Sequence, residues 1–333
     1  MKSNGKTALV LGITGGVGGE TAAALMARGW TVRGLVRDHA AVATSWRGRQ
    51  GTPEWLQGDA MVRDDVVRAA SGVDVIVHAV NPPGYRNWDK LVLPMINNTI
   101  AAAKAAGGAR VVLPGTIYNY DPAATPVIDA DTPQAPRTRK GAVRVALERQ
   151  LEAVSAEVPS LIVRAGDFFG PRSRASWFGQ AVVTPGKPLT RIVHPGRGVG
   201  HAWAYLPDLA ETIARLLDMH DQLDRFERVQ FEGFWDATGA GMTAAIRRAV
   251  GRDLPERAFP WWLMGLGGPL GGFPREAIEI EGFWRNPVRL DNRRLVQLLG
   301  REPRTAATQA VATTLAGLGC LPEPAVALRP RAA

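Results

Sequence analysis

A glycine-rich turn near the start of the chain has the residue types and spacing to hold phosphate groups. Its candidate contacts are Gly12, Thr14, Gly15, Val17 and Gly18. Gly12 would allow a tight turn, Gly15 would let the backbone approach a pyrophosphate, and Gly18 would let a helix pack closely. The alternative is an ordinary glycine-rich connection. The position of the turn after an apolar run and before a helical stretch favours dinucleotide binding.

A strand and a helix must position this turn. Residues 8–11 are an apolar run that predicts a buried strand, and residues 20–28 have the pattern of a helix ending at Gly29. A second strand over 30–36 completes a βαβ unit with parallel strands. The start of the predicted helix would offer N–H groups and a partial positive charge to phosphates.

Arg37 follows the second predicted strand, where the adenosine ribose of a dinucleotide is expected. A basic residue at this place accommodates a 2′-phosphate, whereas an acidic residue binds a 2′-hydroxyl. Arg37, with Arg33 shortly before it, therefore favours NADP. The alternative is that Arg37 is a solvent-exposed loop residue and that Asp38 contacts the ribose, in which case NAD is the cofactor.

The order of elements predicts an α/β protein with a doubly wound parallel sheet, the Rossmann fold. Strands are predicted at 53–59, 73–79, 109–113 and 161–164, and helices at 64–70, 91–106 and 139–155. Ligands of such sheets bind outside the carboxyl ends of the strands. The residues that follow those ends are Asp59, Ala79, Thr116 and Asp167, together with the breaking segment 81–84.

Residue 171 is the predicted end of the dinucleotide-binding domain, 1–171. Beyond it Pro and Gly become frequent, and residues 172–333 hold six of the ten tryptophans. This half predicts a smaller C-terminal substrate lobe, from which 198–220 returns to the first domain. For any single tryptophan, core packing is favoured over lining a substrate pocket. Residues beyond Pro322 are expected to fray.

Composition narrows the classes of partner. The 333 residues carry a net charge of +9, but the arginines are dispersed, which argues against nucleic acid and suits an anionic cofactor. A single cysteine, Cys320, cannot form an intramolecular disulfide and fits a cytoplasmic protein. The five histidines lack metal-ligand spacing, so no metal is expected. No apolar run approaches the roughly 18 residues of a membrane span, so no membrane partner is expected.

The stretches that follow the predicted strands recur in an order that is similar to one family. They are Gly12-x-x-Gly15-x-x-Gly18, Gly58-Asp59, His78-Ala79, 164–171, 205–208 and 288–303. Over most of its length the chain resembles the extended or atypical short-chain dehydrogenases/reductases of the NAD-dependent epimerase/dehydratase group. The resemblance implies a nicotinamide dinucleotide, a small-molecule substrate and, as in many members, a homodimer. His78 itself is expected to be a buried strand-end residue.

The catalytic Tyr-x-x-x-Lys of that family is absent from this chain. Counting back from Glu148, which resembles the glutamate after that pair, places Lys140 and Arg144 at the two positions. By the resemblance Thr116 would orient the substrate and Arg144 would contact ribose or phosphate. Lys140 is a candidate proton donor, because partial burial beside a cation lowers the pKa of a lysine. Tyr118 is an alternative acid, as is the nearby Tyr120.

Two functions remain open at this point. One is an NADP-dependent oxidoreductase or epimerase that acts on a small carbonyl or hydroxyl compound, with Lys140 in place of the usual tyrosine. The other is a sensor or regulatory protein that binds the dinucleotide and has lost the family's chemistry.

Overall fold

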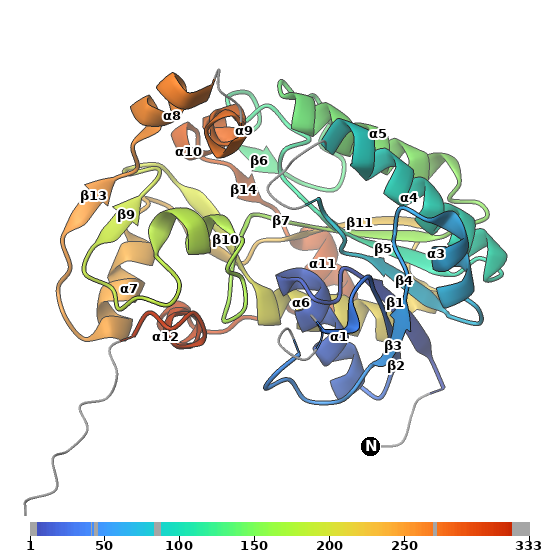
Figure 1. Cartoon of the computed structure of the whole chain (residues 1–333). Helices are drawn as coiled ribbons and strands as arrows, with labels where there is room; N and C mark the ends of the chain where they lie inside the picture. Colours follow the sequence, from blue (N-terminus) through green and yellow to red (C-terminus); the bar gives the residue numbers. More distant parts are fainter. Residues whose placement is uncertain (1–4, 41, 43–45, 83–87, 269–271, 322–333) are drawn as a thin grey trace, which may run out of the picture.

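Seven parallel strands form the centre of the protein (Figure 1). The computed structural model describes residues 5–40, 42, 46–82, 88–268 and 272–321. The strand order is β11-β7-β5-β4-β1-β2-β3, and every neighbouring pair is parallel. The order along the chain reverses between β1 and β4, the place where such sheets bind ligands. The bounds are β1 (Thr7–Leu11), β2 (Thr31–Val36), β3 (Glu54–Gln57), β4 (Val75–His78), β5 (Arg110–Gly115), β7 (Ser160–Ala165) and β11 (Phe226–Phe231).

Helices cover both faces of this sheet, which explains why its strands are apolar throughout. Residues 8–11 of β1, for example, are at most 1% exposed. One face carries α1 (Gly16–Ala27), α6 (Leu206–Asp218) and α11 (Arg293–Leu299). The other carries α3 (Arg63–Ala69), α4 (Trp88–Ala105) and α5 (Arg139–Ala153).

A smaller lobe is built around a second sheet, with the order β12-β10-β8. Its strands are β8 (Asp167–Phe169), β10 (His201–Tyr205) and β12 (Phe234–Asp236). Two short parallel pairs complete it: β9 (Ile192–His194) with β13 (Glu256–Ala258), and β6 (Val127–Ile128) with β14 (Arg289–Leu290). Its helices are η2 (Phe178–Val182), α7 (Gly241–Val250), α8 (Trp261–Gly267), α9 (Gly272–Ile280), α10 (Gly282–Arg285) and α12 (Ala307–Gly317), whereas η3 (His220–Gln222) follows α6 at the main sheet.

The predicted division of the chain assigns too few residues to the sheet domain. The return from the second lobe does not end at residue 220, because β11 follows it and pairs with β7 as the edge strand of the main sheet. Helix α11 then packs on β11. Helix α1 also begins earlier than predicted, at Gly16 rather than at residue 20. Glycine has a low helix propensity, so the glycines of the first turn did not indicate a helix.

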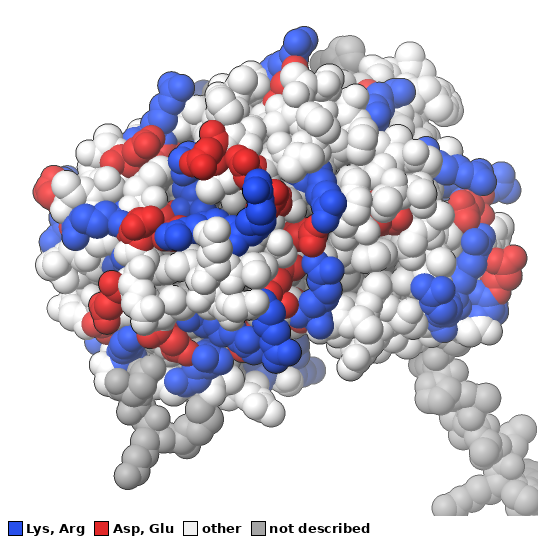
Figure 2. Space-filling view, turned by 180° about the vertical axis from the view of Figure 1, so that it is seen from behind, with Lys and Arg blue, Asp and Glu red and all other residues white. Residues whose placement is uncertain are grey.

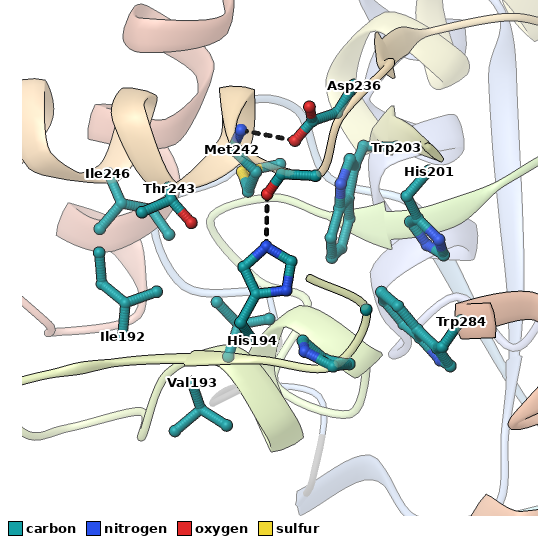
Figure 3. A pocket seen from close by; sticks show the side chains of 14 residues that line it. Ile192, Val193, His194, His201, Trp203, Asp236, Met242, Thr243, Ile246 and Trp284 are labelled. Atoms are coloured by element: carbon teal, nitrogen blue, oxygen red, sulfur yellow. Dashed lines mark hydrogen bonds between the residues drawn. The ribbon is translucent and has the colours of Figure 1, made fainter. Parts of the chain in front are cut away.

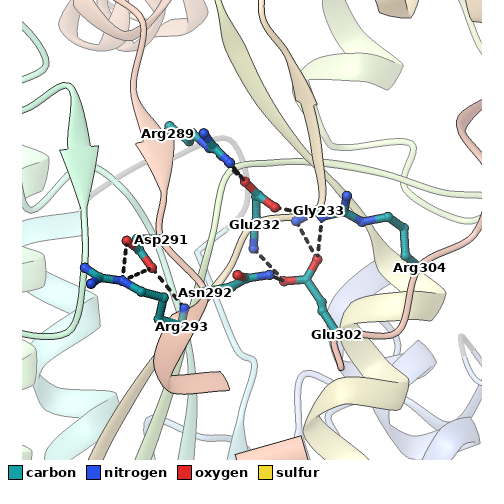
Figure 4. A network of polar contacts seen from close by, with 8 residues as sticks. All are labelled: Glu232, Gly233, Arg289, Asp291, Asn292, Arg293, Glu302 and Arg304. Carbon is teal, nitrogen blue, oxygen red and sulfur yellow. Dashed lines mark hydrogen bonds and ion pairs between the residues drawn. The ribbon is translucent and has the colours of Figure 1, made fainter. Parts of the chain in front are cut away.

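A buried carboxylate joins the C-terminal segment to the edge of the main sheet (Figure 4). Glu302 follows α11, and its side chain is 4% exposed. It accepts hydrogen bonds from the backbone N–H groups of Glu232 and Gly233, both at 2.9 Å, and from Asn292 Nδ2 at 2.8 Å. Glu232 in turn pairs with two arginines, so the segment that resembles the family's C-terminal signature has a structural role here.

Charged side chains of both signs are intermixed on the face shown in Figure 2. On this face the Lys and Arg side chains therefore have acidic neighbours and do not form one basic stripe. Among the helices in the described ranges, none is both long and apolar enough to cross a membrane.

Candidate functional site

The glycine turn after β1 has the tight geometry that its spacing predicts. Gly12 has φ +80°, and a Cβ there would lie 2.5 Å from the carbonyl oxygen of Ala79 at the end of β4. A Cβ on Gly18 would overlap the carbonyl oxygen of Gly12. Both positions therefore require glycine, Gly12 for the turn and Gly18 for the close packing of α1 on β1.

The start of α1 is open to an anion. Gly15 is the N-cap residue, so no side chain caps the first N–H groups, and the first turn holds no acidic residue. Thr14 and Gly15 are exposed and Val17 is half-buried. A twelve-residue helix that begins in this way presents unpaired N–H groups and the positive end of its dipole to the crevice. These residues fit the phosphates of a dinucleotide.

Arg33 on β2 and Arg37 just after it lie in different surroundings. Arg37 lies directly after the strand and is exposed, at the carboxyl edge. Arg33 instead turns to the neighbouring strand, where its Nε lies 3.0 Å from Oε2 of Glu54. Asp59 follows β3 in a turn, with its carboxylate accepting from the Met61 N–H at 2.9 Å. Arg37 and Asp59 thus both follow the carboxyl ends of neighbouring strands, β2 and β3. Arg33 lies within β2 and pairs with Glu54 instead.

Sequence reasoning missed a second pair of arginines, at the side of α1. Oε1 of Glu20 lies 3.4 Å from Nη2 of Arg49 and 3.6 Å from Nη1 of Arg172. The Arg49 guanidinium occupies the space that a Cβ on Gly19 would fill, and its side chain is 3% exposed. Burial lowers the pKa of Arg49, while Glu20 opposes that shift. The sequence signal for this contact is the double glycine at 18–19, because Gly19 leaves room for the Arg49 side chain against α1.

His78 is the buried strand-end residue that the sequence predicts. Its Nδ1 lies 2.8 Å from Oγ1 of Thr99, which donates its own proton to a carbonyl of α4. Burial, with a smaller contribution from Arg144, lowers the pKa of His78 to about 3. Ala79 follows it, half-buried, beside the glycine turn. Of the segment 81–84 expected in the crevice, residues 83 and 84 lie outside the described residues, as do Tyr85 and the tail beyond 321.

Thr116 and Tyr118 follow β5, as predicted, and are hydrogen-bonded to each other. The Tyr118 N–H donates to Oγ1 of Thr116 at 3.0 Å, and Arg164 Nη1 donates to the Thr116 carbonyl at 2.6 Å. The Tyr118 ring is 7% exposed and packs against Phe283 at 5.4 Å. Burial raises the pKa of Tyr120. Thr116 is therefore half-buried just after β5, whereas both tyrosine rings are packed in the core, and the role of Thr116 stays a prediction.

Lys140 and Arg144 lie on α5 but make contacts that sequence could not reveal. Lys140 is 4% exposed, and its Nζ lies 2.6 Å from Oε2 of Glu276 and 3.5 Å from Oε2 of Glu279, both on α9. The Arg144 guanidinium lies 4.6 Å from the centre of the Trp88 ring on α4. The roles of Lys140 as proton donor and of Arg144 as cofactor contact stay predictions, and the ion pairs of Lys140 argue for a structural role.

Asp167 stands after the carboxyl end of β7 and has a partner that sequence reasoning missed. Its Oδ2 lies 2.8 Å from Nε2 of His201 on β10. The His201 ring stacks on Trp284 with centres 3.8 Å apart and planes 8° from parallel. His201 also lines a cavity of about 20 Å³ in the smaller lobe (Figure 3). Trp203 and Trp284 line that cavity and also belong to the core.

No group of three or more His, Cys, Asp or Glu side chains among the described residues is arranged to hold a metal ion.

Comparison with known proteins places this architecture in a family. The profile of the NAD dependent epimerase/dehydratase family matches residues 8–230, and the chain belongs to that family. The resemblance predicted from the motifs is confirmed. The match covers all seven strands of the main sheet except the first residue of β1 and the last residue of β11.

Solved structures confirm the predicted fold. A putative epimerase from Burkholderia cenocepacia is 17% identical with a TM-score of 0.75, and the alignment covers 96% of this chain and 99% of that one. UDP-glucose 4-epimerase from Bifidobacterium longum, solved with NAD+ and UDP, is 15% identical with a TM-score of 0.70, covering 93% and 97%. At these identities the likeness concerns the fold.

A curated relative is a reductase. The 3-diazoavenalumate denitrifying reductase of a Streptomyces species is 30% identical over 178 residues, which are 49% of this chain and 56% of that protein. The match thus spans little more than half the length of the relative.

Proposed function

We propose that the protein is a nicotinamide-dinucleotide-dependent oxidoreductase that transfers a hydride between its cofactor and a small organic substrate. The observation that carries this proposal is the uncapped start of α1, with Gly15 exposed beside the point where the strand order reverses. Membership of the NAD dependent epimerase/dehydratase family supports it. The bound cofactor would supply or accept the hydride.

The chain's own residues divide the remaining tasks. The glycine turn and the first turn of α1 would hold the pyrophosphate, and Asp59 would lie beside the adenosine. Thr116, half-buried at the end of β5, would orient the substrate oxygen. For the proton we favour His201 over Lys140, because His201 is hydrogen-bonded to Asp167 just beyond the carboxyl end of β7, whereas two carboxylates surround the Lys140 ammonium.

Reduction is favoured over epimerisation. The curated relative is named as a reductase. We also propose NADP as the preferred cofactor. Arg37 is exposed at the ribose edge, and Arg49 and Arg172 share a single carboxylate, so the surroundings of α1 carry excess positive charge.

A dinucleotide-binding sensor is the second candidate. The ion pairs of Lys140 favour it, since the residue at the tyrosine's position is engaged in holding α9. Such a protein would bind the cofactor without catalysing a reaction. Because both candidate functions require cofactor binding, this binding must be measured first.

Calorimetric titration of NADPH and NADH into the wild type, Gly15→Ala and Gly268→Ala tests the proposal. A Cβ on Gly15 meets only the Gly12 carbonyl, at 3.2 Å, so the variant should fold, yet the methyl group stands where phosphate must approach. We expect NADPH to bind Gly15→Ala at least about tenfold more weakly than the wild type. Gly268→Ala, which meets nothing within 4 Å, should bind as the wild type does. Absence of binding to the wild type, or an unchanged Gly15→Ala, would refute cofactor binding at this turn.

A further inference from the structure

Arg172 lies beside the first turn of α1 and is only loosely paired there. Its backbone carbonyl is 3.8 Å from the point where a Cβ on Gly16, the first residue of the helix, would stand. Its Nη2 donates to the carbonyl of Gly48 at 3.0 Å, and its Nη1 lies 3.6 Å from Oε1 of Glu20. That distance exceeds the roughly 2.7–2.9 Å of a charge-assisted hydrogen bond. The side chain is 33% exposed, so an anion in solvent can reach it.

Arg49 shares the same carboxylate from a buried position. Its Nη2 lies 3.4 Å from Oε1 of Glu20, its side chain is 3% exposed, and its guanidinium packs against Gly19 and the Trp46 ring. Neither Nε nor Nη1 of Arg49 has a hydrogen-bond partner in the part of the chain that the structure describes, and the same holds for Oε1 of Glu20. One carboxylate therefore neutralises one of two guanidinium groups, and a positive charge is left over.

This surplus charge suits a negatively charged ligand at the start of α1. The first turn of the helix holds no acidic residue, and its N–H groups present the positive end of the helix dipole. Burial and, to a smaller extent, Arg172 lower the pKa of Arg49, whereas Glu20 raises it. A second negative group near the pair would stabilise both guanidinium ions. Arginine side chains bind phosphate in this way, through two N–H groups at once.

We propose that Arg172 donates to a phosphate group of the dinucleotide and that Glu20 competes with this phosphate for the guanidinium. The inference rests on the function proposed above. Without a ligand, Glu20 holds the Arg172 side chain along α1. When a phosphate reaches the first turn, the guanidinium turns toward it and Glu20 stays with the buried Arg49. Removing the carboxylate and removing the arginine must then change cofactor affinity in opposite directions.

Calorimetric titration of NADPH and NADH into the full chain tests this competition. Arg172→Ala should bind NADPH about tenfold more weakly, because one charge-assisted contact is lost. Arg172→Gln, which can still donate to the Gly48 carbonyl, should weaken binding as well. Glu20→Gln should bind NADPH about threefold more tightly, because the neutral amide releases Arg172 and removes a nearby negative charge. A folded Glu20→Gln that binds no more tightly than the wild type would overturn the competition, and unchanged affinity in both Arg172 variants would overturn the contact.

The double variant Glu20→Gln/Arg172→Ala separates competition from a general effect of charge. With Arg172 absent, the loss of Glu20 should bring no gain, so the two substitutions should not be additive. A threefold gain that persists would overturn the competition. Arg28 and Glu211 are the matched control, because Arg28 is also 33% exposed and pairs with Glu211 at 3.2 Å at the other end of α1. Arg28→Ala and Glu211→Gln should leave both affinities unchanged, and shifts equal to those of the first pair would refute the proposal.

The choice of ligand identifies the phosphate and isolates this inference. Equal weakening of NADPH and NADH by Arg172→Ala would assign the contact to the pyrophosphate, and weakening of NADPH alone would assign it to the 2′-phosphate. Inorganic pyrophosphate is titrated as a third ligand. If it shows the opposite shifts in Glu20→Gln and Arg172→Ala while the wild type binds no dinucleotide, only the proposed function fails. If the wild type binds NADPH and neither variant alters the affinity for any of the three ligands, only this inference fails.

Discussion

The ammonium nitrogen of Lys140 lies 2.6 Å from Oε2 of Glu276, and this ion pair fastens the start of α5 to α9. Lys140 Nζ also donates to the Glu276 carbonyl at 2.9 Å, and the Lys140 N–H donates to Glu279 at 2.6 Å. Lys140, which is predicted to stand where the family has its catalytic tyrosine, is thus surrounded by acceptors from α9. Its ion pairs give the start of α5 a structural contact with the smaller lobe.

Replacing Lys140 with Met should therefore change stability more than turnover. We expect the free energy of unfolding to fall by about 2 kcal/mol, because two half-buried carboxylates lose their partner. Turnover of a small carbonyl substrate by NADPH should stay within about tenfold of the wild type. His201→Asn should instead lower turnover by about a hundredfold, the scale of a lost general acid, with NADPH affinity unchanged. The reverse ranking of the two variants would make Lys140 the acid.

Arg37→Ala should weaken NADPH binding selectively. Loss of one charge-assisted contact to a 2′-phosphate predicts an increase of about tenfold in the Kd for NADPH, with the Kd for NADH unchanged. Arg33→Ala is the matched control, because Arg33 lies on the same strand but pairs with Glu54. If both cofactors weaken equally in Arg37→Ala, or if wild type binds NADH as tightly as NADPH, the preference for NADP is wrong.

Local patterns predicted the sheet and the phosphate turn well. Strands buried on both faces are continuous apolar runs. Gly18 is dictated by the carbonyl of Gly12 close to it in sequence, whereas the need for glycine at 12 also comes from Ala79 at the end of β4. The predicted helix began four residues late, because glycine conceals a helical start. The edge strand β11 was missed as part of the main sheet, because its partner β7 lies more than 60 residues earlier.

The contacts that define the candidate site are of longer range still. Asp167 and His201 are 34 residues apart and meet only through the register of β8 with β10. Lys140 finds Glu276 across 136 residues. Neither separation leaves a periodic signal in a single sequence. A histidine followed by alternating aromatic residues, at 201–205, was the sole local sign that β10 faces a special environment.

The buried His78 predicts a specific pH dependence of stability. Folding lowers its pKa to about 3, so the imidazole is neutral in the folded state at acidic pH while the unfolded chain binds a proton below its usual pKa of about 6.5. The free energy of unfolding therefore decreases as the pH falls below about 6.5 toward about 3. From about pH 7.5 to about pH 5 the loss from this residue is about 2 kcal/mol.

Denaturant unfolding of His78→Asn at both pH values isolates this contribution. Asn can keep the hydrogen bond to Thr99 but does not titrate, so the variant should lose about 2 kcal/mol less than the wild type over the interval. His39→Asn, which is exposed, should behave as the wild type does. Identical pH slopes for all three proteins would show that His78 is protonated in the folded state.

Glu302→Ala should loosen the C-terminal segment from the edge of the main sheet. The carboxylate satisfies two backbone N–H groups after β11 and one side-chain amide, and its removal leaves these donors without their acceptor. We expect the free energy of unfolding to fall by about 3 kcal/mol. Glu157→Ala, which removes an exposed pair with Lys104, should change it by less than about 0.5 kcal/mol. Hydrogen exchange in Glu302→Ala should speed most at Glu232 and Gly233, because these N–H groups lose their acceptor and β11 is an edge strand that can open before the central strands do.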